Sequence, residues 1–421
     1  MKKKTIVSMS DHPLSPSGVG TQTKYVLEAL LKTGRYRVIS LGGAIKHHSY
    51  EPQQIEPYGE DWVVHPIDGY GSPEIIRSVL RTERPDLIWF MTDPRFYGWL
   101  WEMEDEIRAL CPMLYYHVWD NYPYPDFNAM WYDSTDVIAS ISKVTHDIVT
   151  TVSPDVEAHY LPHAVDSKCF YPQPPEAVHE FAKGVLQTGD EWRSKTTFFW
   201  NNRNARRKQS GSLIFWFKEF LDKVGHDQAR LIMHTDTKDQ NGQDLFAIVK
   251  NLGLDEGQIY FSQEKLPPEH LALYYSMADC TVNIADAEGF GLATLESLSC
   301  GTPIIVTMTG GLQEQVTDGE NWFGIGIEPA SKAIIGSQQV PYIYEDRVSG
   351  TDVIAALEKI HNMSLEDRVQ LGLMGRNHVQ ANYEYEKFTR RWVELVDQTV
   401  DKYGAWETRK NYKRWHFKEI V

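Results

Sequence analysis

The stretch that decides the fold of this chain is Glu288 to Glu296, which reads Glu-Gly-Phe-Gly-Leu-Ala-Thr-Leu-Glu. A short apolar run, Cys280 to Ile284, comes before it and has the composition of a buried strand. Leucines at helical spacing follow from Leu292 to Leu298, and Gly301 and Pro303 mark the end of that helix. The sequence therefore predicts a strand, a glycine-flanked turn and a helix.

The chemistry of this turn points to a ligand with two kinds of polar group. The first N–H groups of a helix have no partner within the helix, and together with the helix dipole they favour an anion. Glu288 and Glu296 flank the same place, and carboxylates accept hydrogen bonds from hydroxyls. A ligand with both phosphate and sugar hydroxyls satisfies all these groups, and a nucleotide sugar is such a ligand.

The pattern E-G-F-G-L-x-x-L-E resembles the signature of the family-4 retaining glycosyltransferases, which have the GT-B fold. Cys300 to Val306 and Gly310-Gly311 resemble that family's next strand and loop. The resemblance implies two Rossmann-like α/β domains that face each other across a cleft. It also implies transfer of a sugar from a nucleoside diphosphate with retained configuration.

On this resemblance the turn and the helix after it contact the donor. Phe290, Gly291 and Leu292 are expected to bind the donor, and Glu296 is expected to accept hydrogen bonds from the ribose. Glu288 is expected to face the transferred sugar and to be catalytic.

Length and composition agree with a two-domain globular enzyme. The chain has 421 residues, of which 42% are hydrophobic, so two or three domains are expected. Its four cysteines have no metal or redox spacing, which is typical of a cytosolic protein. We find no apolar run long enough to span a membrane and expect a soluble, cytoplasmic protein, with peripheral membrane contact left open. The net charge of −16 argues against a nucleic-acid partner.

Alternating strand and helix patterns predict the domain organisation. Residues 1–170 are expected to form the first Rossmann-like domain and residues 171–384 the second. The resemblance implies that the first domain holds the acceptor and the second holds the donor. Pro172, Pro174 and Pro175 indicate the hinge between them. The resemblance implies that residues 385–421 contain a helix that crosses back to the first domain. The basic tail after this helix is expected to dock on the acidic body.

The first domain offers a glycine-bearing loop. Ser10 to Thr21 carries Gly18 and Gly20 between a predicted strand and a helix expected to begin at Thr23. By itself this spacing is typical of an ordinary turn, and it matches neither a P-loop nor a dinucleotide fingerprint. In the family that the chain resembles, the matching loop approaches the donor diphosphate.

His117 and the aromatic segment after it are the other candidates in this domain. His117 stands at the predicted carboxyl end of a strand, where ligands bind parallel sheets. The resemblance implies a catalytic contact with the donor sugar, with Asp120 orienting the ring. Tyr122 and Tyr124 are candidates for an acceptor platform together with Asp120, although packing beneath a loop also explains them.

The second domain holds a dense basic cluster before the tail. Arg203 and Lys208 keep the five-residue spacing of the family's Gly-Arg…Lys-Gly loop, while Asn202 and Gln209 replace the glycines. Arg offers a bidentate fork for phosphate oxygens and Lys a compact charge, so both are expected in donor binding and catalysis on an exposed loop. In the resembled fold, Ser262-Gln263 offers backbone groups to the base.

These patterns favour a retaining, metal-independent glycosyltransferase without a cofactor. Its donor would be a nucleoside diphosphate sugar, and its acceptor a hydroxyl, in first place that of a saccharide. Two alternatives stay open at this point: a catalytically silent nucleotide-sugar-binding protein, and a nucleotide-sugar epimerase on the same fold. The sequence does not identify the base, the sugar, the acceptor, the oligomeric state or the role of the basic tail.

Overall fold

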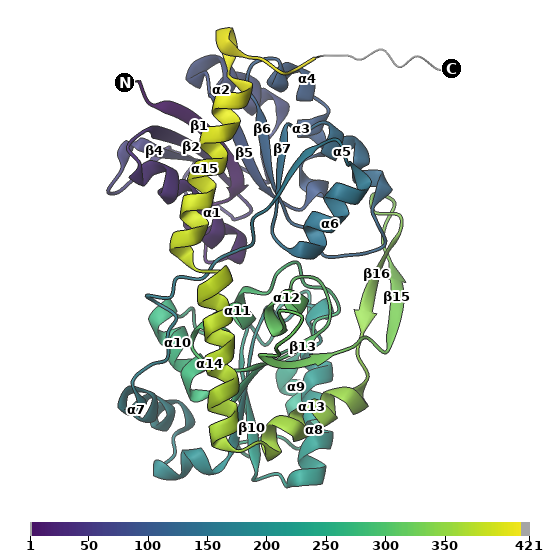
Figure 1. Ribbon diagram of the computed structural model, residues 1–421. Coiled ribbons are helices and arrows are strands. Elements are labelled where there is room, and N and C mark those ends of the chain that lie inside the picture. The colour runs from purple at the N-terminus through teal and green to yellow at the C-terminus, as the bar shows by residue number, and fades with distance from the viewer. Residues whose placement is uncertain (1, 414–421) are drawn as a thin grey trace.

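Two parallel β-sheets, each covered by helices, lie one above the other in the computed structural model, which describes residues 2–413 (Figure 1). The upper sheet has eight strands in the order β3-β4-β2-β1-β5-β6-β7-β8, and only β3 runs antiparallel to its neighbour. The strands are β1 (Lys4–Asp11), β2 (Tyr36–Gly43), β3 (Gln53–Ile55), β4 (Gly59–Pro66), β5 (Leu87–Thr92), β6 (Met113–His117), β7 (Val137–Ser140) and β8 (Glu157–Tyr160).

Six helices accompany this first sheet. Near-continuous apolar strands such as Leu87–Thr92 are buried throughout, because helices cover the sheet on both faces. The helices are α1 (Gly18–Lys32), α2 (Pro73–Glu83), α3 (Gly98–Trp101), α4 (Glu104–Arg108), α5 (Ala129–Asp133) and α6 (Lys143–Val152).

The lower sheet has six parallel strands in the order β11-β10-β9-β12-β13-β14. They are β9 (Thr196–Asn201), β10 (Ala229–His234), β11 (Ile259–Ser262), β12 (Cys280–Asn283), β13 (Ile304–Thr307) and β14 (Gly324–Ile327). The helices around it are α7 (Pro175–Leu186), α8 (Ser210–Val224), α9 (Leu245–Asn251), α10 (Pro268–Met277), α11 (Leu292–Ser299), α12 (Leu312–Val316), α13 (Gly350–Asn362) and α14 (Leu365–Asn382).

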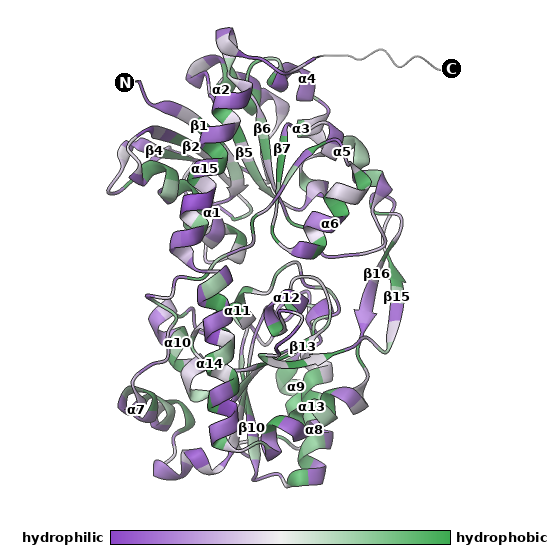
Figure 2. Cartoon of the chain, in the orientation of Figure 1, coloured by the Kyte–Doolittle hydropathy of each residue, from purple (hydrophilic) through white to green (hydrophobic). Residues whose placement is uncertain are grey.

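This architecture confirms the predicted α/β fold class with two Rossmann-like halves. The last strand of the first sheet, β8, ends at Tyr160, and the first strand of the second sheet, β9, begins at Thr196. The expected boundary at residue 170 lies between these two strands. In Figure 2, β7 is green for hydrophobic residues, whereas purple, hydrophilic turns alternate with green along α15. The burial pattern is thus that of sheets enclosed by amphipathic helices.

The long C-terminal helix crosses back to the first domain. Helix α15 (Tyr385–Tyr403) follows α14 and packs along α1 (Figure 1). Its Trp392 is fully buried against the first sheet, with ring centroids 6.0 Å from Trp89 and 4.7 Å from Tyr116. The predicted crossover helix is therefore confirmed.

The described part of the basic tail docks on the first domain, as expected. Arg409 is buried and pairs with Asp136 at 3.0 Å, and Arg84 lies 4.2 Å from the ring of Trp406. Arg414, Trp415 and Lys418, which belong to the predicted tail, lie outside the described residues. Between residues 2 and 413, no helix combines the length and apolarity needed to cross a membrane.

Some local predictions were wrong. Helix α1 begins at Gly18, not after Thr21, because the Ser17 side chain accepts a hydrogen bond from the Gly20 N–H and caps the helix early. The segment from Gly98 to Arg108 forms two short helices, α3 and α4, and not one continuous helix. The hairpin of β15 (Ser331–Ile335) and β16 (Ile343–Arg347) was not predicted, and it reaches from the lower half to the upper half in Figure 1.

Replacing Trp392 with Ala should destabilise the first domain strongly, because a large aromatic side chain is removed from a packed core. The expected cost is about 3–5 kcal/mol, or a fall of roughly 10 °C in the unfolding midpoint. Calorimetric melting of Trp392→Ala and of Glu394→Ala, an exposed position on the same helix, tests this. Equal midpoints for the two variants would contradict the anchoring role of α15.

Candidate functional site

Each sheet has one place where neighbouring strands lead their connections to opposite sides. In the first sheet this switch point lies between β1 and β5, and in the second between β9 and β12. Ligands bind open parallel sheets at the carboxyl ends of the strands at such points. The loop after β9 contains Arg203–Lys208 and the loop after β12 contains Glu288, so both predicted donor segments lie at the second switch point.

The turn before α11 has a backbone that requires glycine. Gly291 has φ +93° and precedes the first residue of α11, and a Cβ there would lie 2.6 Å from the Leu312 Cδ2 atom. Gly310 crosses beneath Glu288 so closely that an added Cβ would lie 1.8 Å from the Glu288 carbonyl oxygen. The backbone is thereby fixed where the α11 N–H groups are free of partners within the helix.

Lys208 and Glu288 form a buried ion pair at the centre of this site. The Lys208 side chain is 9% exposed and that of Glu288 is 13% exposed. Burial raises the pKa of Glu288, but Lys208 and Arg207 outweigh it and hold that pKa below its ordinary value. The carboxylate is therefore ionised near neutral pH, and the expectation that Lys208 lies on an exposed loop was wrong.

Arg207 is the second cation beside Glu288, and the sequence analysis did not select it. Its Nη1 donates to the Ala287 carbonyl at 2.5 Å and lies 3.8 Å from the Asp120 Oδ2 atom. Asp120 belongs to the first domain, and its Cβ lies 3.9 Å from the place where a Gly289 Cβ would stand. Asp120 thus meets the donor loop across the interface of the two halves.

Arg203 points elsewhere. Its side chain is 63% exposed and donates to both carboxylate oxygens of Asp239, at 2.6 and 3.2 Å. The structure therefore does not bring Arg203 to the Lys208–Glu288 pair. The five-residue spacing found Lys208, but it did not reveal that Arg207, one residue earlier, turns toward Glu288.

Glu296 lies one turn into α11 with a different electrostatic environment. It accepts a hydrogen bond from the Tyr275 hydroxyl at 2.7 Å, and burial raises its pKa to about 7. At the carboxyl end of β11, the Ser262 hydroxyl lies 2.9 Å from the His234 Nδ1 atom, and Gln263 Oε1 accepts from Thr237 at 2.7 Å. These groups line the same edge of the second sheet.

His117 does not reach a surface where it could touch a ligand. Its side chain is fully buried, and its two ring nitrogens lie 2.7 Å from the Tyr132 hydroxyl and 3.0 Å from the Tyr115 hydroxyl. Burial lowers its pKa to about 3. The expected contact with the donor sugar is not seen, because this histidine points into the core of the first domain.

A different histidine stands next to the site. The ring of His163 lies 5.2 Å from the ring of Phe290, and its Nδ1 lies 2.7 Å from the Tyr116 hydroxyl. Glu288 is close enough to act on its pKa, which burial nevertheless lowers to about 3. The sequence analysis did not select His163, because its place beside Phe290 depends on a contact between residues far apart in the sequence.

Gly18 and Gly20, the two glycines selected in the first domain, lie in the first turn of α1, which faces the second domain. A Cβ on Gly18 would lie 3.0 Å from the Leu292 Cδ1 atom, so the starts of α1 and α11 meet across the interface. Gly20 is buried beneath, where a Cβ would lie 2.3 Å from the Ser15 hydroxyl. Gly18 is thus beside the predicted donor segment, whereas Gly20 supports the turn from below.

The aromatic segment after β6 is held by its own contacts. The hydroxyls of Tyr122 and Tyr124 both donate to Asp147 Oδ2 at 3.0 Å. The Tyr122 carbonyl accepts from the backbone N–H of Tyr344 at 2.8 Å, so the β15–β16 hairpin lies against this segment. Tyr124 remains 42% exposed and is the more accessible of the two rings.

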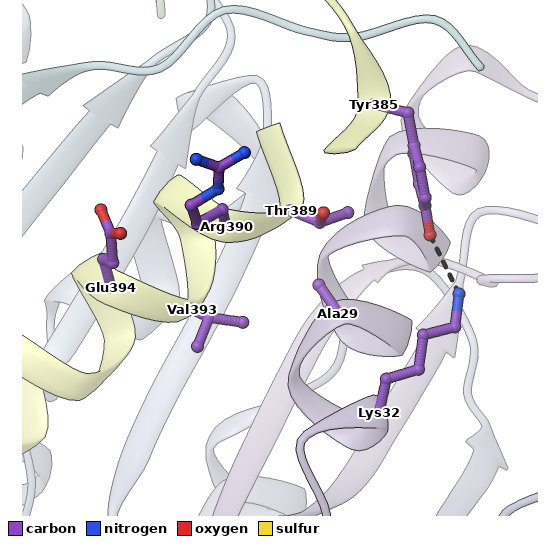
Figure 3. A pocket seen from close by; sticks show the side chains of 7 residues that line it. All are labelled: Ala29, Lys32, Tyr385, Thr389, Arg390, Val393 and Glu394. Carbon is purple, nitrogen blue, oxygen red and sulfur yellow. Dashed lines mark hydrogen bonds between the residues drawn. The ribbon is translucent and has the colours of Figure 1, made fainter. Parts of the chain in front are cut away.

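Two further features lie outside this group of residues. Within the described chain, no group of three or more His, Cys, Asp or Glu side chains is arranged to hold a metal ion. A surface hollow of about 390 Å³ opens between α1 and α15, where Lys32 donates to the Tyr385 hydroxyl at 3.2 Å (Figure 3). Its lining shares no residue with the site above.

Comparison with known proteins agrees with this geometry. Residues 198–335 match the family model described as glycosyl transferases group 1. A D-inositol 3-phosphate glycosyltransferase of Acidothermus cellulolyticus is 35% identical over 108 residues, which cover 25% of this chain and 24% of that protein. A GDP-mannose-dependent phosphatidylinositol monomannoside mannosyltransferase of Mycolicibacterium smegmatis is 24% identical over 274 residues, 63% of each chain. The chain thus covers less than two thirds of these relatives.

Solved structures with the same fold include a sucrose-phosphate synthase from Thermosynechococcus elongatus, with a TM-score of 0.73 and 18% identity over 95% of this chain and all of that one. The Anabaena protein HepE in complex with UDP-glucose has a TM-score of 0.67 and 12% identity over 94% of this chain and all of that one. The predicted GT-B fold is confirmed, and residues 198–335 are similar to the group 1 glycosyl transferases, in agreement with the resemblance. The finer assignment to family 4 stays a prediction.

Glu296 should make stability depend on pH in a defined direction. Its folded pKa of about 7 lies above the ordinary 4.5, so the folded state holds a proton that the unfolded state releases, and stability falls as pH rises from 4.5 to 7. Glu296→Gln removes this dependence and keeps a partner for Tyr275. The free energy of unfolding of wild type should fall between pH 5 and pH 8 by on the order of 1–2 kcal/mol more than that of Glu296→Gln, a figure discounted for partial exposure.

Thermal unfolding of both proteins at pH 5 and pH 8 measures this difference. Glu394→Gln, an exposed carboxylate on α15, serves as the control and should follow wild type at both values. Parallel curves for wild type and Glu296→Gln would show that Glu296 is not held protonated.

Proposed function

We propose that this protein transfers a sugar from a nucleoside diphosphate sugar to a hydroxyl of an acceptor, a saccharide in first place, with retained configuration and without a metal ion. The observation that carries the proposal is the Lys208–Glu288 pair with Arg207, placed at the glycine-bound start of α11. Two cations, a helix N-terminus and a carboxylate at one point suit a diphosphate joined to a polyol.

The diphosphate would lie against Lys208, Arg207 and the first N–H groups of α11. Both side chains are now neutralised by carboxylates, Lys208 by Glu288 and Arg207 in part by Asp120 at 3.8 Å. Phosphate oxygens can replace these carboxylates as partners, which frees Glu288 and Asp120 to accept hydroxyls. One set of contacts thus serves the phosphates and the sugar.

The nucleoside would occupy the edge formed by the ends of β9, β10 and β11. Glu296 would accept from the ribose, and Ser262 and Gln263 would offer polar groups to the base. The relatives support a nucleotide donor, since one of them is GDP-mannose-dependent and one solved neighbour is in complex with UDP-glucose.

The acceptor would lie on the first domain, where carboxylates gather at the ends of the strands. β1 ends at Asp11, which accepts from the Tyr70 hydroxyl at 2.9 Å, and β5 leads to Asp93, which pairs with Arg95 at 2.6 Å. Asp120 stands at the end of the next strand. Such carboxylates hydrogen-bond neutral hydroxyls well, which agrees with a saccharide acceptor.

In the reaction, the bond between the sugar C1 and the diphosphate oxygen breaks while the acceptor oxygen attacks C1 from the same face. The departing diphosphate gains charge, and Lys208, Arg207 and the α11 dipole stabilise that charge in a site already arranged for it. The acceptor proton passes to the departing phosphate oxygen. Glu288 holds the sugar hydroxyls, so no carboxylate has to act as a nucleophile.

A panel of nucleotide sugars, incubated with candidate saccharide acceptors, tests the proposal through release of free nucleotide. We expect one donor to be turned over, which identifies base and sugar together. Two alternatives have distinct outcomes: binding without turnover indicates a silent binding protein, and a changed sugar on an intact or hydrolysed nucleotide indicates an epimerase. Retention is checked by the anomeric configuration of the product.

Loss of the Lys208 charge should raise the activation free energy of turnover by about 2–4 kcal/mol, the scale for one preorganised charged donor. We choose Lys208→Met, which keeps the aliphatic stem, because Lys208→Ala would also open a cavity beside buried Glu288. Lys223→Met, which breaks the surface pair with Glu358 at 2.8 Å, is the matched control. Arg207→Ala should act like Lys208→Met and more strongly than Arg203→Ala, and the reverse order would show that Arg203 moves to the phosphates.

Chelation should leave turnover in place, because the phosphate charge is met by Lys208 and Arg207 side chains. The measurement compares nucleotide release before and after treatment with a chelator. If nucleotide release is lost completely and added magnesium or manganese restores it, the metal-independent mechanism is wrong, although the proposed reaction, glycosyl transfer, still stands.

A further inference from the structure

The β15–β16 hairpin leaves the second domain and ends inside the first. At its tip, Val340 is 3% exposed and Ile343 is 8% exposed, and both belong to the apolar core of the first domain. At its base, the Ala330 N–H donates to the Arg347 carbonyl at 2.8 Å and closes the hairpin at the second sheet. Figure 1 shows it spanning both halves on the side opposite α14 and α15.

Three consecutive residues of β16 contact three different segments of the proposed site. Tyr344 pairs through its backbone with the acceptor-side segment: its N–H donates to the Tyr122 carbonyl at 2.8 Å, and its carbonyl accepts from the Asn121 side chain at 2.8 Å. Glu345 binds Arg206, the first residue of the segment Arg206–Gln209, which we call the phosphate loop. The Asp346 N–H donates to the Asp286 carbonyl at 2.9 Å, two residues before Glu288.

Glu345 is a buried carboxylate that makes a charge-assisted contact with Arg206, whose side chain is 56% exposed. Glu345 is 2% exposed and accepts two hydrogen bonds from Arg206, at 2.7 and 2.9 Å, and a third from Arg347 at 2.8 Å. Arg206 comes directly before Arg207 and Lys208 in the chain. Fixing the Arg206 guanidinium in a bidentate pair therefore restricts the backbone from which both proposed phosphate cations extend.

Asp286 holds the same loop from the other side. It is 2% exposed, pairs with Arg347, and accepts from the Gln209 side chain at 2.7 Å. Its backbone N–H donates to the Arg207 carbonyl at 2.8 Å. The phosphate loop from Arg206 to Gln209 is thus bound at both ends to groups that β16 contacts directly.

We propose that Glu345 is a positioning residue for the phosphate loop, and that β16 couples this loop to the acceptor-side segment Asn121–Tyr122. The inference rests on the proposed function for its catalytic part alone, since the coupling of the two segments is a property of the fold. Glu345 acts through Arg206 and touches neither sugar nor phosphate. Its loss should therefore lower turnover while the donor still binds through Lys208 and Arg207.

The test uses Glu345→Gln, which keeps the size of the side chain and removes its charge, and Glu345→Asp as the conservative variant. We expect Glu345→Gln to lower kcat roughly ten-fold with a smaller change in KM for the donor, and Glu345→Asp to recover part of the loss. Ile334→Thr is the matched control: Ile334 pairs with Tyr344 across the hairpin, but its side chain is 74% exposed. A kcat of Glu345→Gln equal to that of Ile334→Thr would overturn the positioning role.

The coupling is tested without any activity, by hydrogen exchange of the backbone amides. Glu345→Gln should speed exchange in residues 119–124, and Asn121→Ala, at the other end of the link, should speed exchange in residues 203–209. Unchanged exchange at the far segment in either variant would overturn the coupling. A wild-type protein that turns over no donor would instead defeat the proposed function, while the exchange result would still decide the coupling.

Discussion

The buried contact between Lys208 and Glu288 is the interaction on which the rest of the site depends. It joins the loop after β9 to the loop after β12, so it closes the switch point of the second sheet from both sides. Both charges are largely removed from water, and each would be costly to bury alone. The close backbone packing at Gly291 and Gly310 serves this pair, because it fixes the peptide that carries Glu288.

Around this pair the charged groups are arranged as a chain of partners and not as isolated contacts. Arg207 connects the Ala287 carbonyl, next to Glu288, to Asp120 in the first domain, and Arg206 connects the same loop to Glu345 in the hairpin. A ligand that takes up the cations must change several of these contacts together. Binding is therefore tied to the relation between the two domains, as expected of a site formed at an interface.

The sequence predicted the parts of the fold that depend on local periodicity. The crossover helix α15 has apolar residues at helical spacing, and β12 is a short apolar run whose length and flanking turn residues favour a strand. Glu288, Glu296 and Lys208 were selected through the resemblance to a family signature, and the structure brings Lys208 and Glu288 together. What the sequence analysis missed depends on contacts distant in the sequence. His117 lies at a strand end, but its side chain turns into the core. Arg207 and Arg203 have the same charge, but Arg207 contacts the Glu288 loop and Arg203 pairs with Asp239.

The covalent connections between the two domains define how they can move. Apart from the β15–β16 hairpin, the described chain passes between them near Val165 and near Glu384. These two passages lie side by side: the Val165 N–H donates to the Tyr383 carbonyl at 3.0 Å, and the Tyr385 N–H donates to the Val165 carbonyl at 3.2 Å. Two adjacent, hydrogen-bonded connecting segments form an interdomain hinge, which permits rotation about one axis and resists rotation about others. The β15–β16 hairpin lies away from that axis in Figure 1 and contacts both domains, so any rotation at the hinge must change the contacts that the hairpin makes with one of them.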